Sequence, residues 1–365
     1  MLVYFCLSSH GFGHASRQAA VINELHLIQP SWRIVVSSLV EYAFLDLALL
    51  GCPVEFRRCQ WDVGVSQADA LTADLKLTLL SLKELEKILP VIVERESTWI
   101  LSQQEPSLIV ADIPPAAELL ASRVDSPLIW MGNFGWDDIY QSFDPRFEKY
   151  CEQATSAYQK GDFLLRCPFS LPMNWRLPEQ TLSLVASKPK QLPSFLKRLL
   201  IQEIRTIVFL GFGGLGYQFD YNHLKRWPDF LFLLFPSRIS SNIQCLNDID
   251  NVLLLPDGVR AVDVMPFCSL HIGKPGFSSF CEALSQNLGL VVVERQDFSE
   301  AEVLINGVKL HGSHRTLTRE DFQDGKWNLG APLGKPLLTP LKTDGAFVAA
   351  KTIVEIALAS NRFIS

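Results

Sequence analysis

The chain has 365 residues, 48% of them hydrophobic and 20% charged, and its formal net charge is −6. This composition excludes an intrinsically disordered chain, and the length exceeds what a single hydrophobic core usually serves. The acidic balance excludes the clustered positive charge with which nucleic-acid-binding proteins neutralise phosphates. We therefore expect two folded domains of similar size and no nucleic-acid partner.

The apolar segments and the cysteines predict a cytoplasmic protein without a membrane span. No basic residue precedes the run at residues 2–7, and polar residues follow it too soon for a signal peptide. Apolar runs such as residues 230–235 and 288–293 are of strand length, well short of the roughly 20 residues that a spanning helix needs. The eight cysteines form no C-x-x-C pair, which favours buried thiols over disulfides or zinc ligands. A peripheral membrane contact and the oligomeric state stay open.

Short apolar runs alternate with amphipathic segments through the first half of the chain. We expect strands, with helices between them, at residues 2–7, 34–38, 108–111 and 128–131. Such alternation predicts a mostly parallel sheet wrapped by helices, which binds its ligands at the carboxyl ends of the strands. Function is therefore expected in the turns that follow these strands.

Five prolines between residues 167 and 193 indicate a domain boundary. The same alternation then restarts, with strands expected at residues 206–210, 230–235, 252–255, 269–272 and 288–293. A last helix is predicted at residues 346–359, which are rich in Ala, Val and Ile. The expected parts are an N-terminal Rossmann-like domain at 1–166, a linker region at 167–203, a second such domain at 204–345 and a C-terminal helical segment at 346–365.

The first predicted strand runs into a glycine turn that contains two histidines, His10 and His14. Gly11 and Gly13 permit backbone conformations or close approaches that a side chain would forbid, and the following helix offers N–H groups to an anion or a sugar oxygen. His14 could take a proton from an acceptor hydroxyl. The alternative is that both histidines only form hydrogen bonds within the turn.

A buried carboxylate could orient His14, and Asp112 and Asp137 are the two candidates. Asp112 ends an apolar strand, where it either faces the same edge of the sheet or caps a helix. Asp137 follows the next strand, in a segment of aromatic and acidic residues that also holds Asn133 and Trp136. This mixture suits stacking and hydrogen bonding to a sugar, although Trp136 fits a buried core position equally well.

In the second half, the strand at residues 206–210 runs into Gly211-Phe-Gly-Gly-Leu-Gly216, which fits the G-x-G-x-x-G pattern of dinucleotide-binding turns. A nicotinamide site also needs an acidic residue at the end of the following strand, whereas that strand leads to Pro236-Ser-Arg238. We therefore interpret Gly213 and Gly214 as backbone positions that approach a diphosphate or a sugar.

A second glycine turn, Gly273-Lys-Pro-Gly276, opens another predicted helix. Its last glycine and the hydroxyls of Ser278 and Ser279 could meet a phosphate at the helix N-terminus. Glu282, one turn later, could accept hydrogen bonds from ribose hydroxyls, or could only stabilise the helix dipole from the surface. The proline of the turn removes one N–H donor from a phosphate cradle.

The triplet Asp248-Ile-Asp250 matches the D-x-D pattern of metal-dependent glycosyltransferases, but it precedes a strand in a polar loop. We therefore expect a solvated turn there and no metal site. Phosphate-loop, H-E-x-x-H and G-x-S-x-G patterns do not occur in the sequence. Their absence removes the motifs of P-loop ATPases, zincins and α/β-hydrolases.

In this order, the motifs resemble those of the glycosyltransferase-like family that contains the N-terminal half of plant L-arabinokinase and stand-alone bacterial relatives. The matching segments are His10-Gly-Phe-Gly-His-Ala-Ser-Arg17, Gln67-Ala-Asp-Ala-Leu-Thr72, Ala111-Asp-Ile-Pro114, Asn133-Phe-Gly-Trp-Asp-Asp-Ile-Tyr140, Phe212-Gly-Gly214, Gly273-Lys-Pro-Gly-Phe277 and Glu282-Ala-Leu284. The resemblance implies a GT-B fold, an α/β architecture of two Rossmann-like domains whose parallel sheets face each other across a cleft. It also implies metal-independent transfer and a final helix that crosses back to the first domain.

A more distant likeness, to the peptidoglycan lipid N-acetylglucosaminyltransferase and monogalactosyldiacylglycerol synthase, implies that His14 is the catalytic base and that Glu282 holds the donor ribose. The residues expected to bind substrate on the acceptor side are His10, Gly11, Gly13, Arg17, Asp69, Asn133 and Trp136. The residues expected to bind the donor are Gly213, Gly214, Gly273, Lys274, Gly276, Ser278, Ser279 and Glu282. The kinase half of L-arabinokinase has no counterpart here, so no kinase activity is carried over.

Three functions remain as hypotheses. The first is a hexosyl- or pentosyltransferase that moves a sugar from a nucleotide sugar, which acts as co-substrate rather than as bound cofactor, to an unknown acceptor. The second is a non-catalytic nucleotide-sugar-binding regulatory module, and the third is a nucleotide-sugar epimerase or hydrolase on the same fold. Transfer, binding without turnover, and donor conversion without an acceptor distinguish the three.

Overall fold

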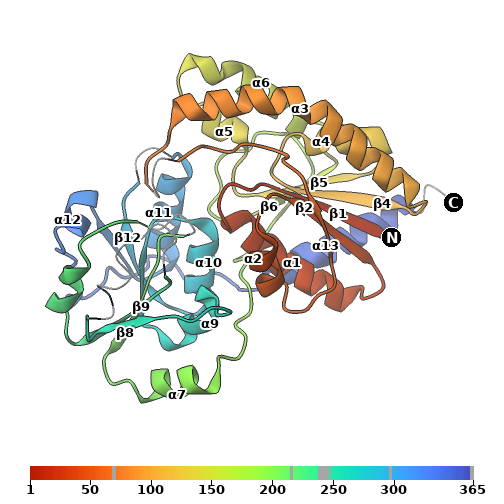
Figure 1. Cartoon of the computed structure of the whole chain (residues 1–365). Coiled ribbons are helices and arrows are strands. Elements are labelled where there is room, and N and C mark those ends of the chain that lie inside the picture. The colour runs from red at the N-terminus through yellow and green to blue at the C-terminus, as the bar shows by residue number, and fades with distance from the viewer. Residues whose placement is uncertain (68–70, 214–216, 237–245, 247, 296–297, 362–365) are drawn as a thin grey trace. The chain divides into compact units, whose positions relative to one another are not determined.

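The computed structural model describes residues 1–361 apart from 68–70, 214–216, 237–245, 247 and 296–297. The chain divides into two compact units (Figure 1). Unit 1 consists of Met1–Ser66, Asp74–Ala186 and Lys342–Ser365, and unit 2 consists of Gln67–Ala73 and Ser187–Leu341. Each unit has its own parallel sheet.

Within the described residues, unit 1 contains a seven-stranded sheet in the order β3-β2-β1-β4-β5-β6-β7, with all pairs parallel. The strands are β1 (Leu2–Leu7), β2 (Arg33–Ser38), β3 (Glu55–Arg58), β4 (Ser107–Asp112), β5 (Leu128–Gly132), β6 (Phe163–Arg166) and β7 (Glu179–Thr181). Every residue of β1 is buried, as in a strand that helices cover on both faces. The four strands expected in this half are confirmed.

Helices cover both faces of the sheet of unit 1. They are α1 (Gly13–Ile28), α2 (Tyr42–Ala48), α3 (Leu75–Ser102), α4 (Ala117–Val124), α5 (Trp136–Tyr140), α6 (Glu148–Tyr158) and α13 (Gly345–Asn361), with the 3₁₀ turn η1 (Pro145–Phe147). Figure 1 shows α3 and α4 on one face and α1 and α13 on the other. The last helix, α13, packs along α1, and the Gly345 N–H at its start donates to the carbonyl of Leu184 at 3.2 Å.

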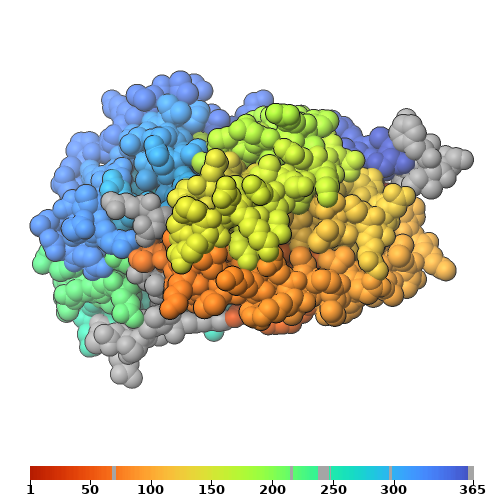
Figure 2. Space-filling model, turned by 90° about the horizontal axis from the view of Figure 1, so that it is seen from above, coloured from red at the N-terminus to blue at the C-terminus, as the bar shows by residue number. Residues whose placement is uncertain are grey.

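On the outside of unit 1, α3 and α6 lie side by side. Figure 2 shows orange α3 next to the yellow segment that contains α6. The side chains of Lys149 and Tyr150, both from α6, contact the carboxylate of Glu86 in α3. These polar contacts join α6 to α3 within unit 1.

In the described part of unit 2, a six-stranded parallel sheet has the order β10-β9-β8-β11-β12-β13. Its strands are β8 (Thr206–Leu210), β9 (Phe230–Leu234), β10 (Val252–Leu254), β11 (Leu270–Gly273), β12 (Gly289–Val293) and β13 (His314–Leu317). Its helices are α7 (Ser194–Gln202), α9 (Ala261–Val264), α10 (Phe277–Ser285), α11 (Glu300–His311) and α12 (Arg319–Gln323), with η2 (Tyr221–Arg226) and η3 (Met265–Phe267). The five strands expected in this half are confirmed.

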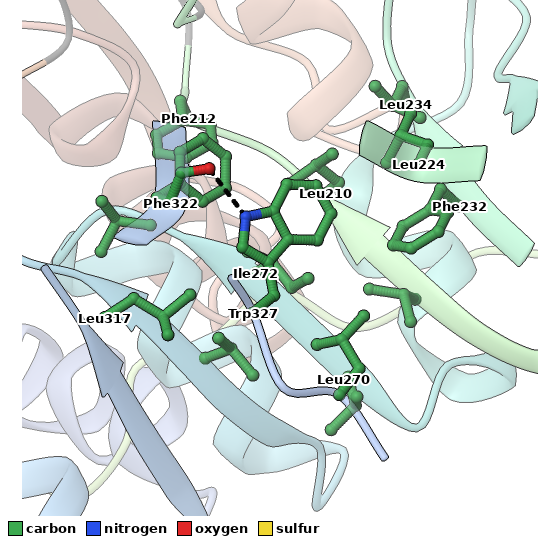
Figure 3. Packing of buried hydrophobic residues seen from close by; sticks show 14 of the residues in the cluster. Leu210, Phe212, Leu224, Phe232, Leu234, Leu270, Ile272, Leu317, Phe322 and Trp327 are labelled. Atoms are coloured by element: carbon green, nitrogen blue, oxygen red, sulfur yellow. Dashed lines mark hydrogen bonds between the residues drawn. The ribbon is translucent and has the colours of Figure 1, made fainter. Parts of the chain in front are cut away.

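Trp327 lies in the core of unit 2 (Figure 3). Its ring stacks on Phe322 with the centroids 5.1 Å apart, and its Nε1 donates to the Phe322 carbonyl at 2.8 Å. Leu210 of β8 and Ile272 of β11 belong to the same buried cluster. A tryptophan is favourable at such a depth because its N–H finds a partner. This core therefore holds the carboxyl ends of β8 and β11, from which the two glycine turns start.

The short segment Gln67–Ala73 also belongs to unit 2, although its neighbours in sequence on both sides belong to unit 1. Leu71 is fully buried in the core cluster of unit 2. Arg319 of α12 donates to the carbonyl of Leu71 at 3.0 Å and to the hydroxyl of Thr72 at 3.3 Å. Asp69, which the sequence predicts on the acceptor side, lies outside the described residues.

Candidate functional site

His14 stands in the first turn of helix α1, after the glycine turn that follows β1. Gly11 has a φ of 72°, a conformation that side chains rarely tolerate, so the turn requires glycine there. The helix begins at Gly13, and the side chain of Phe12 at the N-cap position forms no capping hydrogen bond. The turn thus places the His14 imidazole at the carboxyl edge of the sheet.

The carboxylate of Asp112 forms hydrogen bonds with four nitrogen atoms, which belong to three side chains on one face of α1. It ends β4 beside Leu7 of β1 and is fully buried. His14 Nδ1 lies 2.7 Å from its Oδ1, Arg17 donates through Nε at 2.7 Å and Nη2 at 2.5 Å, and Gln18 donates through Nε2 at 2.7 Å. Positions i, i+3 and i+4 of a helix share a face, which lets the three side chains reach one carboxylate.

Asp112 is an anion in these surroundings. Burial raises the pKa of Asp112, but the charges and hydrogen bonds of Arg17 and His14 outweigh it and bring the pKa down to about 2. An ionised carboxylate only accepts hydrogen bonds, so Nδ1 of His14 is the donor in this pair, and the tautomer of the neutral imidazole that fits has its lone pair on Nε2. An imidazole held in this way by a buried carboxylate can take a proton from a hydroxyl.

Arg17 and Asn133 stand behind Asp112. Both side chains are buried, and Nη1 of Arg17 donates to Oδ1 of Asn133 at 2.7 Å. Asn133 directly follows β5, so the network ties α1 to the ends of β4 and β5. The sequence predicts that both residues bind substrate, whereas these contacts hold the carboxylate that orients His14.

Asp62 is a residue of this site that the sequence does not single out. It is buried and accepts a hydrogen bond from Nε1 of Trp136 at 2.8 Å. Burial raises the pKa of Asp62, against the opposing effects of Ser8, His14 and Trp136. Asp62 comes after the edge strand β3, and the charged sequence Glu55–Arg58 lacks the apolar run that marks a strand. Its position therefore becomes evident only from the fold.

Trp136 is fully buried beside His10. Its ring stacks on Tyr140 with centroids 5.8 Å apart, and its edge meets the His10 ring at 5.5 Å. The Tyr140 hydroxyl donates to the carbonyl of Gly64 at 3.0 Å, and His10 Nδ1 accepts the N–H of Val65 at 3.3 Å. Of the two interpretations of Trp136, the core position fits this arrangement, because the ring is not open to a sugar.

Replacing Trp136 by phenylalanine is expected to lower the free energy of unfolding by about 1–3 kcal/mol. An aromatic ring remains, but the buried carboxylate of Asp62 loses its N–H donor. Urea unfolding followed by circular dichroism measures the change. Trp32→Phe is the matched control, since Trp32 is only partly buried and its indole nitrogen forms no hydrogen bond to any described residue. Equal losses in both variants would contradict a stabilising contact to Asp62.

Asp137, the other candidate carboxylate, forms its bonds away from His14. Its Oδ2 accepts hydrogen bonds from Nε1 of Trp175 at 3.0 Å and from the hydroxyl of Thr155 at 3.3 Å. Burial and a neighbouring carboxylate raise the pKa of Asp137 to about 6. The structure therefore pairs His14 with Asp112, and it places Asp137 in the packing of α5 against α6.

The two glycine turns of unit 2 pack backbone to backbone. Gly211 follows β8, and its N–H donates to a carbonyl of β11 at 2.9 Å. A Cβ on Gly273 would lie 2.3 Å from the carbonyl oxygen of Gly211, so only glycine fits. Gly213 has a φ of 79°, and Cε of Lys274 lies 3.7 Å from the place of its missing Cβ. Gly213, Gly273 and Lys274, which the sequence predicts to bind the donor substrate, thus lie together. Gly214 lies outside the described residues.

Helix α10 begins directly after the second turn. Gly276 precedes it with an extended backbone and, as a glycine, has no side chain with which to cap the helix. Ser278 and Glu282 are buried one turn apart, and Ser279 is partly exposed. The burial of Glu282 contradicts a role confined to the surface. A helix N-terminus with hydroxyls beside it and Lys274 in the preceding turn is a favourable place for a phosphate.

No known protein-family model matches the chain. Among characterised proteins, L-arabinokinase of Arabidopsis thaliana is 26% identical over 331 residues, which are 88% of this chain and 31% of that protein. The chain thus spans about a third of the length of this relative. The resemblance that the motifs indicate is therefore confirmed along most of the chain.

Three solved structures of similar fold are at most 13% identical to the chain. A UDP-glucosyltransferase from Polygonum tinctorium gives a TM-score of 0.64 at 13% identity, covering 100% of this chain and 94% of that one. Arabidopsis thaliana UGT89C1 in complex with UDP gives 0.59 at 12%, covering 98% and 95%, and the calicheamicin glycosyltransferase CalG4 gives 0.56 at 12%, covering 98% and 94%. At such identities the likeness shows the fold alone, and that fold is GT-B.

Proposed function

We propose that this protein transfers a sugar from a nucleotide-sugar donor to the hydroxyl group of an acceptor. The observation that carries the proposal is the buried pair of His14 Nδ1 and Asp112 Oδ1, 2.7 Å apart, at the carboxyl edge of a parallel sheet. The GT-B fold supports it, since two of the similar structures are named as a glucosyltransferase and a glycosyltransferase.

His14 is the base of the proposed reaction. Its Nε2 takes the proton of the acceptor hydroxyl while that oxygen forms a bond to the anomeric carbon of the donor sugar. The bond from the anomeric carbon to the diphosphate oxygen breaks, and the nucleoside diphosphate leaves. The ionised Asp112 stabilises the resulting imidazolium and fixes the direction of the ring. Arg17 and Asn133 keep Asp112 in place.

The departing diphosphate gains negative charge, which a transferase must stabilise. In this proposal, the N-terminus of α10 and the turn at Gly213 supply backbone N–H groups, and Lys274 supplies a cation. Ser278 and Ser279 add hydroxyl donors, and Glu282 accepts hydrogen bonds from the ribose. No metal ion takes part in this scheme, so transfer is expected to persist in EDTA.

The cytoplasm is the compartment that we propose for this activity. The cysteines in the described ranges form no disulfide with one another, and Cys6, Cys59, Cys167 and Cys281 are buried. Thiols persist where glutathione and thioredoxin keep the surroundings reducing. The cysteine chemistry is therefore compatible with that location.

A thermal-shift screen against UDP, GDP, dTDP and their common sugars tests the donor. A ligand at 100 times its Kd adds about 2.7 kcal/mol of stability. The selected nucleotide sugar is then incubated with pools of monosaccharides and other hydroxyl compounds, with and without EDTA, and the released nucleotide and the glycoside are measured. Binding without turnover would favour the regulatory module instead. Donor conversion without an acceptor would favour an epimerase or hydrolase.

Gly273→Ala is expected to weaken binding of the selected nucleotide by at least about tenfold. The new Cβ would meet the carbonyl oxygen of Gly211 and force the two turns apart. Titration calorimetry measures the affinity. Gly330→Ala is the control, because a Cβ at Gly330 meets no atom within 4 Å. Unchanged affinity in a folded Gly273→Ala protein would contradict donor binding at these turns.

A further inference from the structure

Helix α7 of unit 2 carries apolar side chains of two kinds. Leu196 and Leu200 are buried and attach the helix to the unit. Four further apolar residues in and just after the helix are exposed to solvent, with exposed fractions of 60% for Phe195, 41% for Leu199, 63% for Ile201 and 98% for Ile204. Figure 1 draws α7 at the margin of unit 2, away from its sheet. Such a local concentration of exposed apolar surface marks an interaction site.

The exposed apolar residues lie on more than one side of α7. Successive helical residues are about 100° apart around the axis, which puts Leu199 about 40° from Phe195 and Ile201 about 120° from Phe195 in the opposite sense. Ile204 follows the end of the helix. A rigid partner surface covers one side of a helix, whereas a fluid apolar phase can surround all four side chains.

Uncompensated positive charge accompanies these apolar residues. Lys197 and Arg198 are exposed, and neither has an ion-pair partner among the residues that the structure describes. The nearest acidic residue in sequence, Glu203, is bound to Arg205 at 2.7 Å. The chain has a net charge of −6, whereas this helix carries a local positive charge. Its charge is complementary to an anionic surface.

We propose that α7 binds the surface of membranes that contain anionic lipids. Phe195, Leu199, Ile201 and Ile204 enter the boundary between headgroups and acyl chains, and the two cations contact lipid phosphates. The binding is peripheral. None of the helices in the described part of the chain is long and apolar enough to cross a bilayer. The proposed surface belongs to unit 2, whereas His14 belongs to unit 1, and the proposal does not depend on the function proposed for His14.

Sedimentation of the full chain with lipid vesicles tests the proposal. We expect binding to vesicles of phosphatidylcholine and phosphatidylglycerol, at least about tenfold weaker binding to phosphatidylcholine alone, and a decrease with added salt. The double variant Phe195→Ser/Ile201→Ser is expected to bind the anionic vesicles at least about tenfold more weakly. Lys197→Glu/Arg198→Glu is expected to have a similar effect by removing the charge attraction.

Leu337→Ser/Leu338→Ser is the matched control, since both leucines are exposed elsewhere in unit 2. It should bind vesicles like the unsubstituted protein, and thermal unfolding should show that all variants are folded. No sedimentation with anionic vesicles, or an equal loss in the control, would overturn the proposal. A dimer that dissociates in Phe195→Ser/Ile201→Ser would likewise overturn it, because α7 would then be a protein interface.

Discussion

Sugar transfer by the His14→Ala variant is expected to be about 10²- to 10⁴-fold slower than transfer by the unsubstituted protein. Alanine removes the Nε2 lone pair that accepts the proton, and it leaves unit 2, which we propose binds the donor, unchanged. Affinity for the nucleotide should therefore stay within about twofold. Initial rates with the selected donor and acceptor measure the first effect, and titration calorimetry measures the second.

His26→Ala provides the control for this experiment. His26 lies in the last turn of the same helix, so the substitution is chemically identical but remote from Asp112. Its transfer rate should equal that of the unsubstituted protein. Full activity of His14→Ala would refute the assignment of the base. A loss of nucleotide affinity in His14→Ala would show that the variant acts on something other than proton transfer.

Asp112→Asn is expected to lower the free energy of unfolding by about 3–5 kcal/mol. Asparagine keeps the size of the side chain, but the buried guanidinium of Arg17 loses its carboxylate partner. Transfer should also fall by about 10⁴-fold, as when an amide replaces the orienting carboxylate of a catalytic histidine and favours the wrong tautomer. Urea unfolding and initial rates measure the two effects. Asp46→Asn, an exposed position on α2, should change neither.

Asp112→Asn is also expected to change how the free energy of unfolding depends on pH. The pKa of Asp112 is about 2 in the folded protein and 3.8 ordinarily, so between these values the unfolded chain binds the proton more readily. The contribution of Asp112 to stability is complete above pH 4 to 5 and is lost as pH falls through 2, a difference of about 2 kcal/mol. The free energy of unfolding of both proteins is measured from pH 6 to pH 2. The loss of about 2 kcal/mol should occur only in the protein that contains Asp112. A constant difference would contradict the ion pair.

Most strands of both sheets could be predicted from their apolar runs, because helices bury them from both sides. The interior strand β6 was not predicted, since its apolar run is short and ends in Arg166. The edge strands β3, β7 and β13 were not predicted either. They contain residues such as Arg57, Gln180 and Arg315, which a strand with one open edge tolerates because it is less deeply buried. The place of Gln67–Ala73 in unit 2 also needed the structure, since the burial of Leu71 depends on side chains from distant parts of the chain.

The sequence predicts those residues of the candidate site that lie at the ends of apolar strands. His14 comes soon after β1, and Asp112 is the last residue of the neighbouring strand β4, so parallel pairing brings them together. The choice of Asp112 over Asp137 depends on the direction in which α5 turns its first residues, and spacing in the sequence does not reveal that direction. Asp62 could not be found because it follows β3, an edge strand without an apolar signal.

The discontinuous make-up of unit 1 has a consequence for synthesis on the ribosome. Its helix α13, Gly345–Asn361, packs along α1, yet the chain between Ser187 and Leu341 belongs to unit 2. While that stretch is translated, the nascent sheet of unit 1 has no α13, and the surface of α1 on which α13 packs stays uncovered. Exposed apolar surface on a nascent chain is what chaperones bind. The unit that begins first can therefore be completed only after the other has been synthesised.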